Sequence, residues 1–138
     1  MIWIMSRVGE TFFTIVGCMD GRIQCPVKHF GQDYFHAKYA DTITEAGLVG
    51  IVSKESVDSF LLDSIKKKIF ISLEKHHSKG IIVHGHEDCA GNPVSFEQQK
   101  RDIRASAHRI ADLVGRSVEI LSVFVTRGGE TWVVEKLS

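Results

Sequence analysis

The sequence is poor in proline, which interrupts helices and strands, and in cysteine, which can cross-link a chain. Its 138 residues include two prolines and three cysteines. Three cysteines are an odd number and do not make the disulfide framework of a small secreted protein. No internal repeat, low-complexity tract or linker-like stretch interrupts the chain. A length of 138 residues is enough for one hydrophobic core and too short for two. The sequence therefore predicts one domain over residues 1–138.

An excess of charge of one sign is also missing. The 17 basic and 17 acidic residues give a formal net charge of zero, with no basic block and no basic stretch interleaved with aromatic residues. Because nucleic-acid binding depends on neutralising phosphates, no nucleic-acid partner is expected. A chain with so little net charge has little protection from self-association, which fits a homo-oligomer.

Long hydrophobic runs are absent as well, so no membrane partner is expected. The apolar start at residues 1–5 is shorter than the apolar region of a signal peptide. Two cysteines fall in clusters that suggest metal binding, and thiolate ligands need a reducing compartment. These observations together predict a cytoplasmic protein.

What the sequence does contain is an alternation of apolar runs with amphipathic stretches. Five segments are predicted to be strands: residues 11–16, 34–40, 80–83, 118–125 and 131–135. Two are predicted to be helices: residues 53–78, and a segment that opens at residue 95 and ends at residue 115. Residues 21–33 are expected to form a loop or a short helix. Strands separated by helices predict an α/β fold, with a mostly parallel central sheet of four to five strands flanked by helices and an antiparallel edge strand.

The ends of the two predicted helices carry their own signals. Ser53 is placed to cap the first helix, and Gly80 follows its end, where a left-handed residue is favoured. Phe60 is expected to widen the apolar stripe of that helix. In the second helix, Ser95 begins a capping box and Gly115 ends the apolar pattern.

Two short clusters each follow a predicted buried strand. The first holds Cys18, Asp20 and Arg22, and the second holds His86 and Cys89. Open α/β sheets place their ligand sites where strands end. Two thiolates and an imidazole with a fourth position left over are the donors of a catalytic zinc site.

The carboxylate beside the first thiol leaves two alternatives open. Asp20 either fills the fourth zinc position or forms a hydrogen bond to a metal-bound hydroxide, and Arg22 is placed to hold that carboxylate through a bidentate fork. Taken singly, each part has a simpler explanation, since a buried cysteine is usually a core residue and an Asp-x-Arg pair is usually a surface ion pair. His84 lies on the same face as His86 and is favoured as a structural histidine over a neighbour of the site.

The paired motifs, Cys18-x-Asp20-x-Arg22 and Gly85-His86-x-x-Cys89, resemble the zinc-binding signature of the β-class carbonic anhydrases. The resemblance implies that Cys18, His86 and Cys89 are zinc ligands and that Asp20 and Arg22 form a catalytic pair. It also implies reversible hydration of carbon dioxide to bicarbonate by a zinc-bound hydroxide, in a homodimer or higher homo-oligomer. A bound zinc ion lowers the pKa of water from about 15.7 to about 7, which makes hydroxide available near neutral pH.

The substrate pocket is less defined than the metal site. Gln32 matches the register of a glutamine that helps to bind substrate in some members, with Gln24 as the other candidate. Backbone amides around Ala90 and Gly91 are expected to face the bicarbonate oxygens.

Other activities stay open at this stage. A relative acting on a similar small electrophile, such as carbon disulfide or carbonyl sulfide, would use the same chemistry. A non-catalytic zinc-binding protein is a further alternative. Thiol redox chemistry has weaker support because the chain contains no Cys-x-x-Cys pair.

Overall fold

The computed structural model of the chain describes residues 8–138, so the expectation about residues 1–5 lies outside the described residues. The elements in chain order are β1 (Phe12–Cys18), α1 (Gln24–Phe35), β2 (Tyr39–Glu45), α2 (Leu48–Val52), α3 (Ser59–Lys75), β3 (Ile81–His86), α4 (Phe96–Val114), β4 (Ile120–Gly128) and β5 (Thr131–Lys136). The strands form one sheet in the order β2-β1-β3-β4-β5. Neighbouring strands from β2 to β4 are parallel, and β5 is antiparallel to β4 at the edge. The predicted α/β class and the antiparallel edge strand are confirmed.

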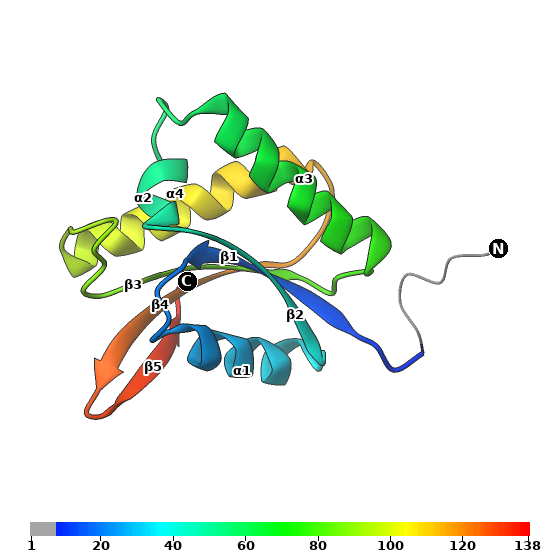
Figure 1. Cartoon of the computed structure of the whole chain (residues 1–138), viewed down its shortest axis with the longest axis horizontal. Helices are drawn as coiled ribbons and strands as arrows, with labels where there is room; N and C mark the ends of the chain where they lie inside the picture. Colours follow the sequence, from blue (N-terminus) through cyan, green and yellow to red (C-terminus); the bar gives the residue numbers. More distant parts are fainter. Residues whose placement is uncertain (1–7) are drawn as a thin grey trace.

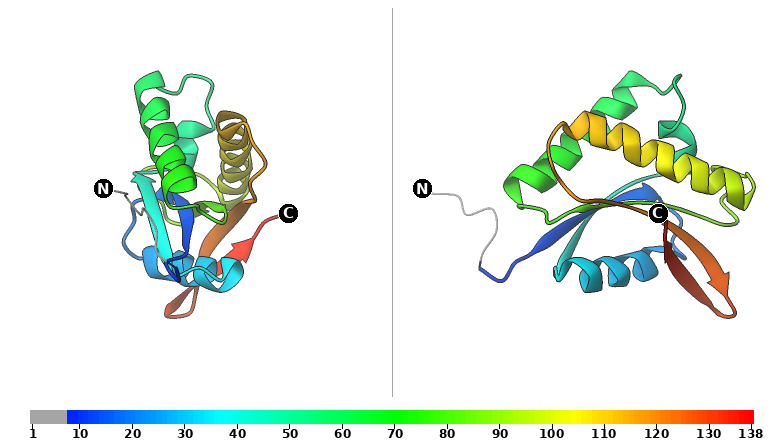
Figure 2. Two further views of the ribbon diagram at one scale, coloured as in Figure 1. Left: turned by 90° about the vertical axis from the view of Figure 1, so that its right-hand side faces the viewer. Right: turned by 180° about the vertical axis from the view of Figure 1, so that it is seen from behind.

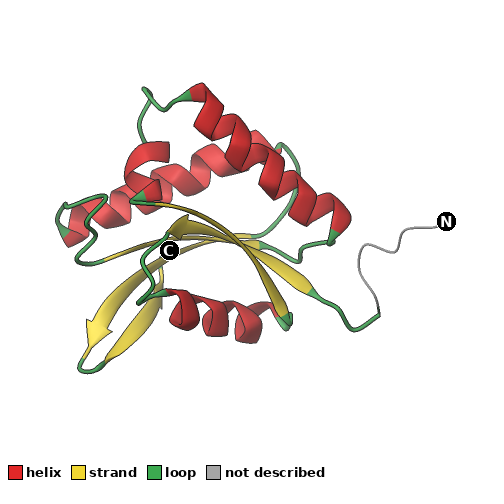
Figure 3. Cartoon of the chain, in the orientation of Figure 1, coloured by secondary structure: helices red, strands yellow, loops and turns green. Residues whose placement is uncertain are grey.

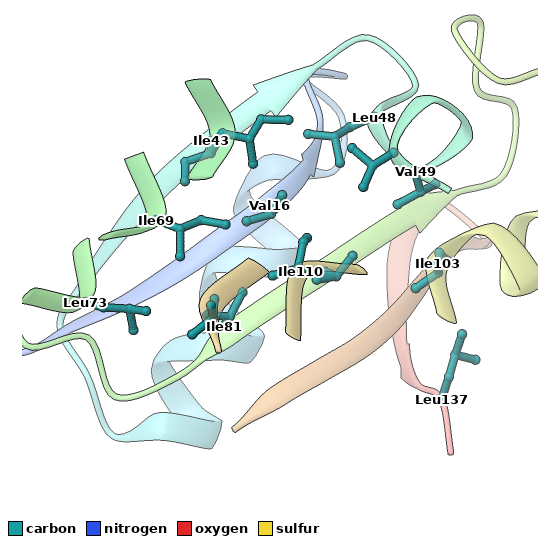
Figure 4. Close-up of a cluster of buried hydrophobic side chains, with 14 of the residues drawn as sticks. Val16, Ile43, Leu48, Val49, Ile69, Leu73, Ile81, Ile103, Ile110 and Leu137 are labelled. Atoms are coloured by element: carbon teal, nitrogen blue, oxygen red, sulfur yellow. The ribbon is translucent and has the colours of Figure 1, made fainter. Parts of the chain in front are cut away.

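Helices cover both faces of the sheet. Helices α2, α3 and α4 lie on one face and α1 lies on the other (Figures 1 and 3). Figure 2 shows the same layers from the side and from behind. Each face has its own apolar cluster, and the one under α2, α3 and α4 is drawn in Figure 4, where Ile69 and Ile110 face Val16 and Ile81 of the sheet. This burial is the main stabilising contribution to the fold.

The second strand is displaced from its predicted place. Residues 34 and 35 end helix α1 instead of opening a strand, because Val27, Gly31 and Phe35 recur at helical spacing and are buried together. His36, in the left-handed conformation at φ 51°, ends that helix. The real strand, β2, has only Ile43 buried, so it carries no continuous apolar run that would mark it in the sequence.

The helix predicted over residues 53–78 is present as α3, but both of its predicted ends are wrong. Asp58, not Ser53, caps α3, accepting a hydrogen bond of 2.8 Å from the backbone N–H of Phe60. The side chain of Phe60 is 85% exposed and so lies off the apolar stripe. The left-handed residue after the helix is His77, with φ 53°, instead of Gly80. In contrast, Ser95 caps α4 and the left-handed Gly115 ends it, as predicted.

The topology brings the two clusters together. Strands β1 and β3 are adjacent and parallel, with Val16 opposite Val83 in register. Cys18 is the last residue of β1 and His86 is the last residue of β3. Carboxyl ends of adjacent parallel strands meet at one edge of the sheet, so their side chains converge there.

Among the described residues, no helix has the length and apolar character needed to cross a membrane.

Gly17 is expected to be essential for stability because a Cβ at this position would overlap the buried imidazole of His84. We expect Gly17→Ala to destabilise the fold by about 3 kcal/mol, the upper range for overpacking a core. The melting temperature, followed by circular dichroism, should fall by roughly 10 °C for a chain of this size. Gly21→Ala is the matched control, since a Cβ there meets nothing within 4 Å. Equal melting temperatures for the two variants would contradict this account of Gly17.

Candidate metal centre

Three sequence-predicted ligands lie together at the carboxyl edge of the sheet. The donor atoms of Cys18, His86 and Cys89 are all within 4.8 Å of one another. The two Sγ atoms are 3.7 Å apart, so the cysteines are free thiols in contact and not a disulfide. All three side chains are buried, with His86 fully excluded from solvent. Of the described residues, these are the ones that form a cluster able to hold a metal ion.

His86 is oriented by its other ring nitrogen. Its Nδ1–H donates a hydrogen bond of 2.7 Å to the carbonyl oxygen of Glu87. This leaves Nε2 as the donor atom that faces the thiols, and Nε2 is buried without a hydrogen-bond partner in the described part of the chain. A carbonyl acceptor on the outer nitrogen is the usual way in which a ligating histidine is held in position. Soft thiolates with one imidazole are a donor set that suits zinc.

Backbone amides support both thiols. The N–H of Gly47, just after β2, donates to Cys18 Sγ at 3.4 Å. Although burial raises it, the pKa of Cys18 is lowered to about 7, because the imidazole of His86 and the amide of Gly47 favour the thiolate. Burial and the neighbouring Cys18 raise the pKa of Cys89, and the backbone amides of Gly91 and Asn92 partly oppose them. In the metal-free site, Cys18 is therefore the thiol that ionises more readily, and Cys89 is the one that keeps its proton to higher pH.

The predicted carboxylate–guanidinium fork is present. Arg22 donates from Nε to both oxygens of Asp20, at 3.1 and 3.2 Å, and from Nη2 to Oδ2 at 2.7 Å. The backbone N–H of Arg22 adds a further hydrogen bond of 2.9 Å to Oδ1. These contacts hold the pKa of Asp20 at about 2, so this carboxylate is ionised at neutral pH.

Asp20 lies beside the three-residue cluster without joining it. Its Oδ2 is 3.9 Å from His86 Nε2, and it is not among the residues whose donor atoms are mutually within 4.8 Å. Four hydrogen bonds from Arg22 direct the carboxylate toward the guanidinium instead. In this arrangement the Asp20 carboxylate is paired with Arg22 and contributes no donor atom to the cluster.

Of the two glutamines considered for substrate binding, only Gln24 lies beside the metal-site loop. Gln24 donates from Nε2 to the carbonyl oxygens of Cys18, at 2.9 Å, and of Asp20, at 2.7 Å, and so it shapes the ligand loop. Gln32 lies near the far end of α1 and donates to the carbonyl of Lys38, just before β2. The chain does not bring Gln32 to the cluster, because α1 runs back along the sheet away from Cys18.

The turn after Cys89 directs a backbone amide toward the thiol of Cys89. A Cβ at Gly47 would overlap the backbone of Gly91, so these two glycines pack directly together. The amide of Gly47 is directed to Cys18, and the amide of Gly91 is directed to Cys89. The Gly91 amide, which is expected from the sequence to face bicarbonate, therefore contacts a thiol in this structure. Ala90 is exposed beside it. No pattern in the sequence marks Gly47 as a site residue, because the predicted second strand does not end there.

His84 lies in the core, on the same sheet face as His86. Only 1% of it is exposed, and neither ring nitrogen has a hydrogen-bond partner in residues 8–138. Burial lowers the pKa of His84 to about 3, so the ring is neutral. Its close packing against Gly17 agrees with the prediction that His84 is a structural histidine.

Three further residues at the site were not expected from the sequence. Arg22 and Arg127 both donate to the carboxylate of Asp88. The ring of Trp132 in β5 lies nearly perpendicular to the imidazole of His86, with ring centroids 6.4 Å apart. The β4–β5 hairpin brings Arg127 and Trp132 to this edge by folding back on the sheet. No local pattern in the sequence marks that contact.

An α/β sheet with a Cys-His-Cys cluster at the carboxyl ends of adjacent strands, beside an Asp–Arg pair, defines a carbonic anhydrase-like protein with a candidate metal site. Residues 8–138 match the model of the family described as "Putative carbonic anhydrase". The match spans nearly the whole chain, so the protein belongs to this carbonic anhydrase family.

Two solved structures share the fold. A β-carbonic anhydrase, isoform I, from Trichomonas vaginalis has 15% sequence identity and a TM-score of 0.58, covering 88% of this chain and 80% of that one. A carbonic anhydrase from Streptococcus mutans has 18% identity and a TM-score of 0.51, covering 100% of this chain and 87% of that one. At these identities the similarity shows the fold alone. No curated protein matches the sequence.

Proposed function

We propose that this protein catalyses the zinc-dependent, reversible hydration of carbon dioxide to bicarbonate. The observation that carries the proposal is the meeting of Cys18, His86 and Cys89 within 4.8 Å, with the ionised Asp20 held next to them by Arg22. Membership of the carbonic anhydrase family supports the same reaction.

Cys18, His86 and Cys89 would hold the zinc ion. When bound, the ion supplies Lewis-acid chemistry by lowering the pKa of a water molecule to about 7. The chain contributes a buried pocket with two thiol ligands and a fixed imidazole, which orients the donors before binding.

Asp20 would accept a hydrogen bond from the attacking oxygen and so direct a lone pair of that oxygen toward the carbon atom of the substrate. This role requires a carboxylate that stays ionised at neutral pH, which the pKa of about 2 provides. It also requires a fixed position, which the hydrogen bonds from Arg22 provide. Orientation and charge, rather than proton release by Asp20 itself, are its contributions.

Stopped-flow measurement of carbon dioxide hydration near pH 8.5 tests the proposal on zinc-loaded protein. We expect saturable activity that disappears after zinc removal and returns when zinc is restored. Rates equal to those of buffer, with zinc bound, would favour a non-catalytic zinc protein. The same assay with carbon disulfide or carbonyl sulfide distinguishes a hydrolase of those substrates.

Zinc affinity is expected to fall as the pH is lowered. The metal binds thiolates, so protons must leave the thiols on binding. From pH 8 to 7 the proton of Cys89, whose pKa is raised, must be displaced, and below the Cys18 pKa of about 7 a second proton competes. The apparent affinity should drop about tenfold per pH unit above pH 7 and more steeply below it. Competition with a chromophoric chelator measures this, and a pH-independent affinity would argue against thiolate ligands.

The compartment and the assembly are part of the proposal. We propose a cytoplasmic location because zinc-binding thiolates persist in a reducing compartment. We also propose a homodimer or higher homo-oligomer, supported by zero net charge and by β2, whose outer edge has no neighbouring strand within residues 8–138. Light scattering coupled to size-exclusion chromatography measures the oligomeric state.

A further inference from the structure

Arg22 connects the two loops that carry the metal-site residues. On one side it binds Asp20, in its own loop after β1. On the other side its Nη1 donates to Asp88 Oδ2 and its Nη2 donates to the carbonyl oxygen of Asp88, both at 3.1 Å. Asp88 lies between His86 and Cys89, so one guanidinium bridges both halves of the cluster.

The backbone of Asp88 is shaped for this contact. Its φ is 55°, in the left-handed region that few residues other than glycine, asparagine and aspartate adopt readily. In this conformation both the carbonyl and the carboxylate of Asp88 meet the guanidinium of Arg22. An unusual backbone conformation in the turn between two ligands points to a role in the site.

Trp132 covers the same guanidinium from the β4–β5 hairpin. The Cζ of Arg22 is 5.0 Å from the centre of the indole ring, and the Cζ of Arg127 is 4.7 Å from it. Arg127 also donates to Asp88 Oδ2, at 3.2 Å. Both arginines therefore contact the indole of Trp132 and the carboxylate of Asp88, and the indole also lies nearly perpendicular to the ring of His86.

The two contacts differ in expected strength. The side chain of Asp88 is 67% exposed, and an exposed ion pair contributes little because water screens it. Trp132 is half-buried and offers an aromatic face, the better of the two positions for a cation. Removing the indole should therefore have the larger effect on Arg22.

We propose that Trp132 and Asp88 are positioning residues that hold Arg22 on Asp20, and thereby keep the Asp20 carboxylate away from the fourth position of the metal. The inference rests on the proposed metal centre. When the indole is absent, Arg22 is no longer fixed, and Asp20 is free to turn toward the cluster that it already approaches to 3.9 Å.

Azide binding to the cobalt-loaded protein reports whether the fourth position is open. Followed by visible absorption, the affinity for azide should fall about tenfold in Trp132→Leu and less in Asp88→Asn, in the range expected for residues that support a metal site. Trp132→Phe, which keeps an aromatic face, should stay close to the unmodified protein. Asp63→Asn, an exposed change on α3, is the matched control for Asp88→Asn.

A second substitution shows whether the effect passes through Asp20. In the Trp132→Leu background, Asp20→Ala should restore azide affinity because no carboxylate remains to occupy the fourth position. A merely structural role for Trp132 would leave the affinity low in the double variant. Unchanged azide affinity in Trp132→Leu, or a loss that Asp20→Ala does not restore, would overturn the proposal.

A metal-free measurement separates this inference from the proposed function. The Nε–H of Arg22 donates to both oxygens of Asp20 and should give a nuclear magnetic resonance signal protected from exchange with water. Trp132→Leu should remove that protection, and unchanged protection would overturn the positioning role. Failure of the proposed function would instead appear as absent metal binding or absent hydration in the unmodified protein.

Discussion

Replacing Cys89 with alanine is expected to remove zinc from the protein. Cys89 Sγ lies 3.7 Å from Cys18 Sγ and shares the buried site with His86, so the variant leaves only two donors. Three protein ligands are the usual set of a catalytic zinc. Loss of one of three ligands, each with about a third of a binding free energy of about 10–16 kcal/mol, should weaken zinc binding by roughly 10²- to 10⁴-fold. Metal analysis after dialysis should then find almost no zinc in the variant.

The third cysteine supplies the matched control. Cys25 is a free thiol on the surface, in the first turn of α1. We expect Cys25→Ser to retain zinc at about one ion per chain, as in the unmodified protein. Equal zinc contents in Cys89→Ala and Cys25→Ser would show that the buried cluster is not the metal site.

Replacing Asp20 with asparagine should abolish most of the activity while zinc remains bound. The amide keeps the size of the side chain but loses the negative charge that accepts the hydrogen bond and pairs with Arg22. We expect kcat/KM for carbon dioxide hydration to fall by about 10²- to 10³-fold, the range for loss of one preorganised group that orients and stabilises the reacting atoms. Stopped-flow kinetics and zinc analysis on the same sample separate the two effects.

Asp33→Asn tests whether the charge change alone matters. Asp33 is exposed on α1, and its replacement should leave kcat/KM unchanged. Zinc loss in Asp20→Asn that accounts for the lost activity would contradict the orienting role. Full activity with zinc bound would exclude Asp20 from the reaction.

The metal cluster was predictable from the sequence because each ligand follows a buried strand. The runs before Cys18 and His86 are mostly apolar and almost completely buried, and parallel strands of this kind align their carboxyl ends. The Asp20–Arg22 contact was predictable because it lies within a single loop. Short sequence separation makes such a contact depend on local geometry, not on tertiary packing.

Contacts made by the hairpin could not be predicted in the same way. Trp132 reaches Arg22 across 110 positions of sequence, and its contact depends on how the β4–β5 hairpin folds back. The left-handed backbone of Asp88 could not be predicted either, because aspartate adopts this conformation in a minority of cases and the contact with Arg22 that accompanies it depends on the fold.

The fold was predicted best where burial is complete on a strand or regular on a helix. Helix α4 has a capping serine and a terminal glycine around a periodic apolar face, and its limits were found. Strand β2 lies at the edge of the sheet with one buried residue, Ile43, and its position was missed. Edge strands bury too little apolar surface to leave a pattern in the sequence.

The most direct test of the account is the exchange of ¹⁸O between labelled carbon dioxide and water at chemical equilibrium, measured by mass spectrometry. This measurement follows the interconversion of carbon dioxide and bicarbonate without a net change in pH. We predict that the zinc-loaded protein accelerates loss of the label, that chelation returns the exchange to the uncatalysed rate, and that zinc restores it. Exchange at the uncatalysed rate from folded protein with zinc bound at Cys18, His86 and Cys89 would contradict the account.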